Sequence, residues 1–355
     1  MKEAEVFDVT IIGGGPAGLF SSFYSGLREM KTKIIEYQNQ LGGKVHVYPE
    51  KLIWDVGGIP PISGEKLIEQ LVEQALTFQP TVVLGEKVSE ITKNEAGLFV
   101  LKTESGEKHY SRAVIVAIGG GIINPQKLEV EGAENFFSSN LNYTIKSLKK
   151  FKDKVVVISG GGHTAVDWAN ELEPIAKKVY LTYRKDTLNA HEAQVSQLLN
   201  SSVQCFFYTE ITKLIPDGTG TIIEKVELTN NQTGEVTTLP VDEVVVNHGY
   251  KREQSLLEES KLNIEMVNEY FMKGNVFCET SVPGLYAAGD VIHYEGKVHL
   301  IAGAFQDAIN AVNKAKLYIQ PEADESGIVS SHNDIFQKRN RELINKQLQE
   351  QVVVK

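Results

Sequence analysis

The sequence predicts an α/β fold that contains two Rossmann-like dinucleotide-binding domains, and three observations support this fold class. A short apolar run leads into the glycine pattern Gly13-x-Gly15-x-x-Gly18. An acid, Glu36, ends the next apolar run 23 residues after Gly13. The same arrangement returns at residues 155–165. A strand, a glycine turn and a helix in this order are typical of the dinucleotide-binding βαβ unit.

Each glycine of the first turn has its own expected task. Gly13 lets the chain turn tightly, and Gly15 lets the backbone approach a pyrophosphate. Gly18 lets the following helix pack close to the strand, so that its N-terminal N–H groups face the phosphates. Glu36 is placed to accept hydrogen bonds from ribose hydroxyls. A glycine triplet alone can also be a structural turn, but the acid and the second copy favour a dinucleotide site.

The second turn differs from the first in the charge that follows its second strand. Here the strand ends in Tyr183-Arg184-Lys185 instead of an acid. An acid would repel a ribose 2′-phosphate, whereas Arg184 and Lys185 can pair with one. The sequence therefore predicts FAD at the first turn and NADPH at the second, with a solvated surface pair as the alternative reading of the two cations. The predicted NADPH-binding residues are Gly160, Gly162, His163, Thr164, Ala165, Arg184 and Lys185.

The N-terminal part of the chain predicts alternating strands and helices. Strands are expected at 6–12 and 33–36, parallel and on either side of a helix that starts near Pro16. An amphipathic helix should open at Ser63-Gly64-Glu65, because apolar residues recur on one face of the following turns. Other expected elements are a loop at 41–49, an irregular stretch at 54–61, short strands at 82–84, 88–91, 98–102 and 108–111, and a buried strand at 113–119.

The remainder predicts an inserted domain and a return to the first one. Residues 121–153 are expected to be a connection, and the second unit starts at Lys154. Further strands are expected at 178–183, 222–228, 243–247 and 284–290, then helices at 301–318 and in the charged segment 335–354. The predicted domains are an FAD-binding domain of residues 1–119 and 281–355, and an NADPH-binding domain of residues 120–280.

Composition narrows the class of protein. A chain of 355 residues suits two domains, and 42% hydrophobic with 23% charged residues is typical of a soluble globular protein. A net charge of −10 disfavours nucleic-acid or membrane-surface partners. No apolar run approaches the roughly 20 residues of a membrane span, and Met1–Glu5 lacks the features of a signal peptide. Cys205 and Cys278 are predicted to be reduced thiols of a cytoplasmic protein. The scattered histidines predict no metal site.

With these motifs assembled, the chain resembles the thioredoxin-reductase-like flavoproteins over nearly its whole length. Thioredoxin reductases carry a redox C-x-x-C just before the second nucleotide strand, where this chain has Asn142-Tyr143-Thr144-Ile145. Disulfide reduction through such a dithiol is therefore excluded. The sequence is most similar to the thioredoxin-reductase-like class of ferredoxin–NADP reductases, which lack the dithiol. The matching segments are Leu41-Gly42-Gly43, Tyr48-Pro49-Glu50-Lys51, Gly289-Asp290 and Tyr294-Glu295-Gly296-Lys297.

The resemblance implies roles for individual residues. Glu36 would bind the FAD ribose, Tyr48 would stack on the isoalloxazine ring, and Asp290 would bond the ribityl chain. The helix that starts near Ile301 would point its N-terminus at the flavin, where the positive end of the helix dipole would favour the negatively charged, reduced form of the flavin. For Tyr48, a surface tyrosine ahead of Pro49 is the alternative. The full set expected to bind FAD is Gly13, Gly15, Gly18, Glu36, Gly43, Lys44, Tyr48, Val88, Ile123, Asp290, Val329 and Ser331, the last two covering the second ring face.

The NADPH motif departs from the family pattern. Members commonly carry His-Arg-Arg followed by a further Arg, where this chain has Tyr183, Arg184, Lys185 and Asn189. Lysine cannot make the bidentate contact that arginine makes with a phosphate. The expectation is a preference for NADPH that is less steep than in an enzyme with the full motif.

The function implied is electron transfer from NADPH to FAD and then singly to ferredoxin or flavodoxin, by a homodimer and without a catalytic side-chain acid or base. Two alternatives stay open: a reductase of low-molecular-weight disulfides, quinones or iron complexes, and a non-enzymatic FAD-binding module that senses redox state. For an acidic partner, the lysine run of residues 146–154 is a candidate docking site, with a solvated turn as the alternative.

Overall fold

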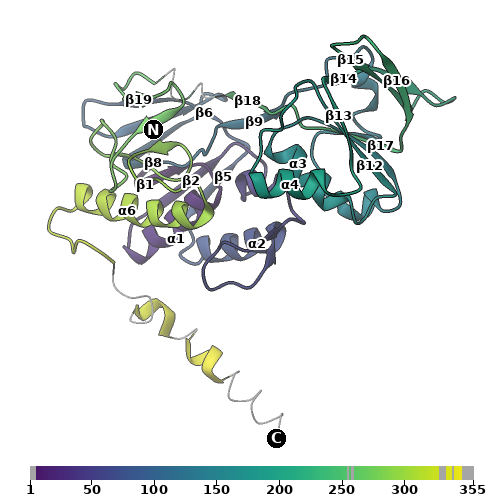
Figure 1. Cartoon of the computed structure of the whole chain (residues 1–355). Coiled ribbons are helices and arrows are strands. Elements are labelled where there is room, and N and C mark those ends of the chain that lie inside the picture. Colours follow the sequence, from purple (N-terminus) through teal and green to yellow (C-terminus); the bar gives the residue numbers. More distant parts are fainter. Residues whose placement is uncertain (1–4, 254–255, 257–259, 328–332, 338–339, 346–355) are drawn as a thin grey trace, which may run out of the picture.

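The computed structural model of the chain forms two lobes joined by two crossings of the backbone (Figure 1). It describes residues 5–253, 256, 260–327, 333–337 and 340–345. The first lobe contains the N-terminal end of the described chain, the second is inserted in the middle, and the last described helical residues extend away from both lobes (Figure 1). We call them the first and the second domain.

The first domain is built on a sheet in the order β5-β2-β1-β8-β7-β6. At its centre, β1 (Val6–Ile12) lies parallel to both β2 (Thr32–Glu36) and β8 (Lys108–Val116), and α1 (Pro16–Leu27) connects β1 to β2. This confirms the predicted strand–helix–strand unit. The remaining strands of this sheet are β5 (Thr81–Leu84), β6 (Val88–Lys93) and β7 (Phe99–Thr103).

Strand β8 corrects one prediction. The sequence predicted two strands, at 108–111 and 113–119, but the structure has one continuous strand of nine residues. Its first half pairs antiparallel with β7, and its second half pairs parallel with β21 (Leu285–Ala287) on the same edge. The polar residues Ser111 and Arg112 look like an interruption in the sequence because the strand changes neighbours there.

Helix α2 (Gly64–Ala75) begins where the sequence predicts, at Ser63, whose Oγ accepts a hydrogen bond from the Lys66 amide. Its apolar face buries Leu67, Ile68 and Leu71. The expected loop at 41–49 is partly ordered as the 3₁₀ helix η1 (Gly43–Val47). Between them lies the hairpin of β3 (Leu52–Ile53) and β4 (Ile62–Ser63).

The second domain has a parallel sheet in the order β10-β17-β11-β12-β13 and an antiparallel sheet of β14, β15 and β16. Its glycine turn lies between β11 (Val155–Ser159) and α3 (His163–Leu172) and confirms the second βαβ unit. The other elements are β10 (Leu141–Asn142), β12 (Lys178–Tyr183), α4 (Glu192–Leu199), β13 (Gln204–Phe207), β14 (Thr209–Pro216), β15 (Ile223–Asn230), β16 (Val236–Pro240), β17 (Glu243–Val246) and the 3₁₀ helices η2 (Ala133–Phe136) and η3 (Leu148–Phe151).

The two crossings between the domains are hydrogen-bonded to each other. Strand β9 (Ile122–Pro125) leads out of the first domain and pairs antiparallel with β18 (Tyr250–Glu253), which leads back (Figure 1). The stretch 121–153, expected to be a plain connection, thus contains β9 as well as β10, which extends the second sheet. Their strand character comes from partners far along the chain.

The chain re-enters the first domain earlier than the predicted boundary at 281. Leu256, Met272 and Cys278 pack in the apolar core of the first domain. This part of the chain also forms a small three-stranded sheet of β19 (Met266–Val267), β20 (Phe271–Lys273) and β22 (Ile292–His293). Helix α6 (Ile301–Ile319) then packs beside α1 (Figure 1), and small residues such as Ala308 and Ala311 are on its buried face. Beyond it, η5 (Asp334–Phe336) and the helical residues 340–345 are the described part of the segment predicted as a helix.

Candidate functional site

A cavity of about 920 Å³ opens at the carboxyl ends of β1, β2, β8 and β21 in the first domain. This is the edge at which open α/β sheets bind their ligands. The first glycine turn forms its floor, η1 and the segment Leu52–Asp55 form one wall, and the start of α6 forms the opposite wall. The second domain closes one side through Thr164, Asp167 and Trp168 of α3.

The glycine turn of this cavity leaves no space for side chains at two positions. A Cβ on Gly13 would lie 2.5 Å from the carbonyl oxygen of Ala117, and one on Gly18 would lie 1.9 Å from that of Gly13. Gly15 lines the cavity opposite Gly43, where a Cβ would lie 2.7 Å from the Gly15 Cα. Two backbone segments therefore approach each other closely at Gly15 and Gly43. Gly18 does not line the cavity and, as expected, packs closely behind it.

Glu36 ends β2 at the wall of the cavity, with its side chain buried. Its carboxylate accepts hydrogen bonds from the amides of Gly14, at 2.5 Å, and Gln38, at 2.8 Å. These bonds orient the acid towards the glycine turn. Because each carboxylate oxygen can accept more than one hydrogen bond, Glu36 still has acceptor capacity for ribose hydroxyls.

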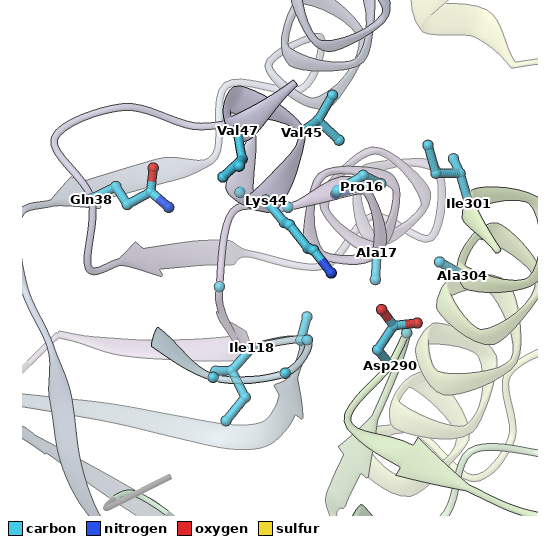
Figure 2. Close-up of a pocket in the computed structure, with 18 of the residues that line it drawn as sticks. Pro16, Ala17, Gln38, Lys44, Val45, Val47, Ile118, Asp290, Ile301 and Ala304 are labelled. Carbon is cyan, nitrogen blue, oxygen red and sulfur yellow. The ribbon is translucent and has the colours of Figure 1, made fainter. Parts of the chain in front are cut away.

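Lys44 and Tyr48 enter the site from η1. Figure 2 shows the Lys44 side chain extending into the cavity towards Ala17. Tyr48 comes directly after η1 and lines the same wall. Its side chain packs against two apolar clusters, the one that contains the buried face of α2 and the one in the second domain. Burial, with a contribution from the charge of Asp290, raises the pKa of the Tyr48 phenol, so the ring remains neutral. Val88, buried at the start of β6, also lines the cavity.

Asp290 and the start of α6 face the site from the other side. In Figure 2 the Asp290 carboxylate points into the cavity below Ala17, beside Ile301 and Ala304. Its Oδ1 lies 3.5 Å from Nδ1 of His299, which also lines the cavity. No side chain caps the N-terminus of α6, so its first N–H groups remain available to a ligand.

The Tyr48–Lys51 segment connects the cavity to the second domain. Lys51 Nζ lies 2.6 Å from Asp167 Oδ2 and 3.6 Å from Glu171 on α3. The neighbouring Glu50 accepts a hydrogen bond from the Leu148 amide at 2.5 Å. Sequence reasoning identified this segment by resemblance but missed its partners, because no local signal connects Glu50 and Lys51 with residues more than 90 positions away.

The second glycine turn follows the carboxyl end of β11. A Cβ on Gly160 would lie 2.4 Å from the Asn247 carbonyl oxygen, whereas one on Gly162 would meet no atom within 4 Å. Gly162 is the N-cap of α3. No side chain accepts a hydrogen bond from the first N–H groups of α3, so they remain available to a ligand. Of the predicted residues here, Ala165 is buried, while His163 and Thr164 are exposed and Thr164 also reaches the first cavity.

Arg184 and Lys185 follow β12 beside this turn, and both are exposed. The Tyr183 ring packs over Gly161, and the backbone N–H of Asn189 donates a hydrogen bond to the Gly161 carbonyl oxygen at 2.8 Å. His248, whose Nε2 lies 2.8 Å from Ser159 Oγ, has a pKa lowered by burial and by the charge of Arg184. The structure therefore brings the predicted cations and the predicted glycines together at one surface.

Some predictions lie outside the described residues. Val329 and Ser331 do so entirely, and for Ile123 only the backbone is described. Cys205 and Cys278 are both free thiols. Among the described side chains, His, Cys, Asp and Glu form no group of three able to hold a metal ion. The described helices include none that combines the length and the apolar character needed to cross a membrane.

Comparison with known proteins agrees with this geometry. The family described as "Pyridine nucleotide-disulphide oxidoreductase" matches residues 7–315. "Ferredoxin--NADP reductase 1" of Bacillus licheniformis is 69% identical and covers 98% of this chain and 99% of its own length. The protein of the same name from Lysinibacillus sphaericus is 64% identical over 98% of this chain and its own full length.

Comparison with solved structures identifies the fold. Thioredoxin reductase of T. acidophilum superposes with a TM-score of 0.72 at 25% identity, covering 88% of this chain and 98% of its own. The bacillithiol disulfide reductase of Staphylococcus aureus reaches 0.65 at 22% identity, covering 87% and 98%. The chain therefore has the thioredoxin-reductase-like fold and belongs to the pyridine nucleotide-disulphide oxidoreductase family, within which it is a member of the ferredoxin–NADP reductases.

Proposed function

We propose that this protein takes a hydride from NADPH, holds the electrons on FAD, and passes them singly to a ferredoxin or a flavodoxin. The observation that carries the proposal is the pairing of two unlike glycine turns on one chain: the first lines a large cavity beside the buried acid Glu36, and the second lies beside the exposed cations Arg184 and Lys185. Close relatives named ferredoxin–NADP reductase support the choice of acceptor.

The residues of the first domain fit FAD. The turn that Gly13 allows would bring the backbone at Gly15 and Gly43 close to a pyrophosphate, and Glu36 would accept hydrogen bonds from the ribose. Bound FAD accepts electrons as a pair and releases them one at a time. Tyr48 shields one face of the ring system from water. The uncapped start of α6 and Lys44 would place positive charge at the cavity, which would favour electron uptake by a bound flavin.

In the second domain, NADPH would lie across Gly160 and Gly162 with its 2′-phosphate on Arg184 and Lys185. Thr164 lies in the first turn of α3 and also lines the FAD cavity, so the two sites adjoin along this helix. The ion pair of Lys51 with Asp167 holds α3 against the wall of that cavity. We also infer a homodimer, on the resemblance to the family, and a cytoplasmic location, on the two free thiols.

Rapid-mixing kinetics test the proposal. The FAD-loaded protein, reduced without oxygen by NADPH, is mixed with a ferredoxin, a flavodoxin or a low-molecular-weight disulfide. We expect rapid reoxidation by the first two and slow reoxidation by the disulfide. A protein that retains FAD but is not bleached by NADPH would contradict the proposal. Replacing Cys205 and Cys278 with Ser should leave flavin reduction unchanged, because neither thiol has a partner for a dithiol.

A further inference from the structure

A buried polar network lies under the segment that follows β21, next to the proposed FAD site. Its centre is Asp307 on α6, whose side chain is 0% exposed. Lys297 Nζ lies 2.7 Å from Asp307 Oδ2, and the Lys297 side chain is 1% exposed. A buried ion pair of this kind persists only where its geometry and further hydrogen bonds compensate the lost hydration.

Further donors complete the network around the same carboxylate. Tyr294 Oη donates to Oδ1 at 2.6 Å, and the Gly289 amide donates to Oδ2 at 2.9 Å. The Cys278 thiol lies against Asp307 as well, and burial together with that charge raises its pKa. Both carboxylate oxygens are therefore engaged. The neutral phenol of Tyr294, whose pKa is also raised, remains a donor.

The network connects both ends of one segment. Residues 289–300 leave β21, pass through β22 and return to α6. One end is Gly289, directly before Asp290, and the other is Leu300, the N-cap of α6. Between them, His293, Glu295 and Val298 are exposed, whereas the tips of Tyr294 and Lys297 turn inward to Asp307. The return is tight, because a Cβ on Gly303 would lie 2.2 Å from the Val298 carbonyl oxygen.

Both ends of this segment line the cavity. Gly289 and Asp290 do so at one end, and His299, Leu300 and Ile301 at the other. Figure 2 shows Asp290, Ile301 and Ala304 as neighbours on this wall. The hydrogen bond from the Gly289 amide fixes the backbone that presents Asp290, and Tyr294 and Lys297 tie the returning chain to α6. A change at Asp307 would therefore move two groups of the wall together.

We propose that Asp307, with Lys297 and Tyr294, is a positioning group for the FAD site: it sets the placement of Asp290 relative to the N-terminus of α6. This role gives a physical reason for the segment Tyr294-Glu295-Gly296-Lys297. The inference rests on the proposed FAD site and goes beyond it, because none of the three side chains needs to touch the cofactor.

Apoprotein titrated with FAD provides the test, read by flavin fluorescence and by the position of the visible absorption band. Asp307→Asn keeps the shape but removes the charge and one acceptor oxygen. We expect FAD binding to weaken about ten-fold or more, which corresponds to the usual free-energy contribution of a hydrogen bond to a charged group, and the visible absorption band to shift. Asp307→Glu restores the carboxylate and should recover part of that loss. Tyr294→Phe removes a single donor and should have a smaller effect in the same direction.

A matched control separates positioning from general stability. Arg28 is also buried, and it binds the far end of α6 through Asn313, at 2.8 Å, without lining the cavity. Arg28→Met should lower the melting temperature of the apoprotein but leave FAD affinity and the absorption band unchanged. If Arg28→Met weakens FAD as much as Asp307→Asn, the network stabilises the fold only and the inference is wrong.

The remaining outcomes are equally decisive. Wild-type affinity and an unshifted band in both Asp307→Asn and Tyr294→Phe would overturn the inference. If Asp307→Asn does not fold, Tyr294→Phe decides alone. Failure of the FAD site itself gives a different result: the wild-type apoprotein would not bind FAD, or Glu36→Ala would bind it as tightly as the wild type.

Discussion

The two glycine turns place their leading glycine in the same way. A Cβ on Gly13 would lie 2.5 Å from the Ala117 carbonyl oxygen, and one on Gly160 would lie 2.4 Å from that of Asn247. In each domain the blocking carbonyl comes directly after a central strand, β8 or β17. The turn itself is therefore common to both domains, and it does not distinguish the two nucleotides.

The surroundings of the turns differ. The first lines a large cavity, the acid Glu36 beside it is buried, and its third glycine leaves no room for a methyl group. The second accommodates Ala165 at that position, and its cations are exposed. The comparison thus separates the two turns by the charge beside them, a buried acid at the first and exposed cations at the second.

The largest expected effect is at Gly18. In Gly18→Ala the new methyl carbon would lie 1.9 Å from the Gly13 carbonyl oxygen, so α1 would have to move away from β1. We expect loss of most bound FAD and a melting temperature lowered by several degrees, measured by the ratio of visible to ultraviolet absorbance and by calorimetry. Ala165→Gly is the control in the second turn and should keep FAD content. Full FAD content in Gly18→Ala would remove the distinction between the turns.

Arg184→Ala should have the next largest effect and act on NADPH alone. Losing a charged hydrogen bond to the 2′-phosphate costs about 1.5–3 kcal/mol, or roughly ten- to a hundred-fold in affinity. NADH lacks this phosphate and serves as the control. The measurement is KM for both nucleotides in ferricyanide reduction. Equal losses for NADPH and NADH would mean that Arg184 does not contact the phosphate.

Substitutions at Tyr48 should have a smaller effect on FAD binding at the first-domain cavity. Stacking of an aromatic ring contributes about 0.5–1.5 kcal/mol beyond its buried area, so Tyr48→Ser should weaken FAD several-fold and shift the visible band. Tyr48→Trp should retain the cofactor because it keeps an aromatic face. FAD titration of both apoproteins gives the comparison. An unaltered spectrum and affinity in Tyr48→Ser would show that the ring is not stacked on the flavin.

The smallest expected effect concerns partner docking. In the lysine run, Lys150 is already engaged: its Nζ lies 3.1 Å from Glu243 Oε2 and donates to Asn142 Oδ1 at 2.9 Å. Lys149 is exposed. If the run docks an acidic ferredoxin, Lys149→Gln should slow ferredoxin reduction at low salt but not ferricyanide reduction. Lys150→Gln should instead lower the melting temperature. Ferredoxin rates in Lys149→Gln that match the wild type at every ionic strength would exclude this surface.

Local signals carried much of the fold prediction. Both βαβ units, α2 with its Ser63 cap, and α6 follow from apolar periodicity, glycine turns and capping residues close together in the sequence. The junction of β9 with β18 did not follow, because each strand is short and its partner lies more than a hundred residues away. The re-entry near Leu256 was missed for the same reason.

The site shows the same division. The glycines, Glu36 and Arg184 were predicted from pattern and charge, and Lys44, Tyr48 and Asp290 were predicted from the resemblance. Asp307 gave no signal, because a single acid within a helix normally lies on its solvated face, and here burial depends on Lys297 and Tyr294. The contact of Lys51 with Asp167 depends on how the domains meet, which no local pattern encodes.

Strand β8 has a consequence for the order of events during synthesis. Its residues 114–116 pair with β21 on an edge that β7 leaves open, and roughly 170 residues separate the two strands in the chain. On the ribosome this edge stays unpaired while the whole second domain is made, for about 10–30 s at the usual elongation rates. The second domain, being continuous, can fold in that interval. The nascent first domain meanwhile presents an apolar strand edge of the kind that invites aggregation, and chaperone binding should be concentrated there until Leu285 emerges.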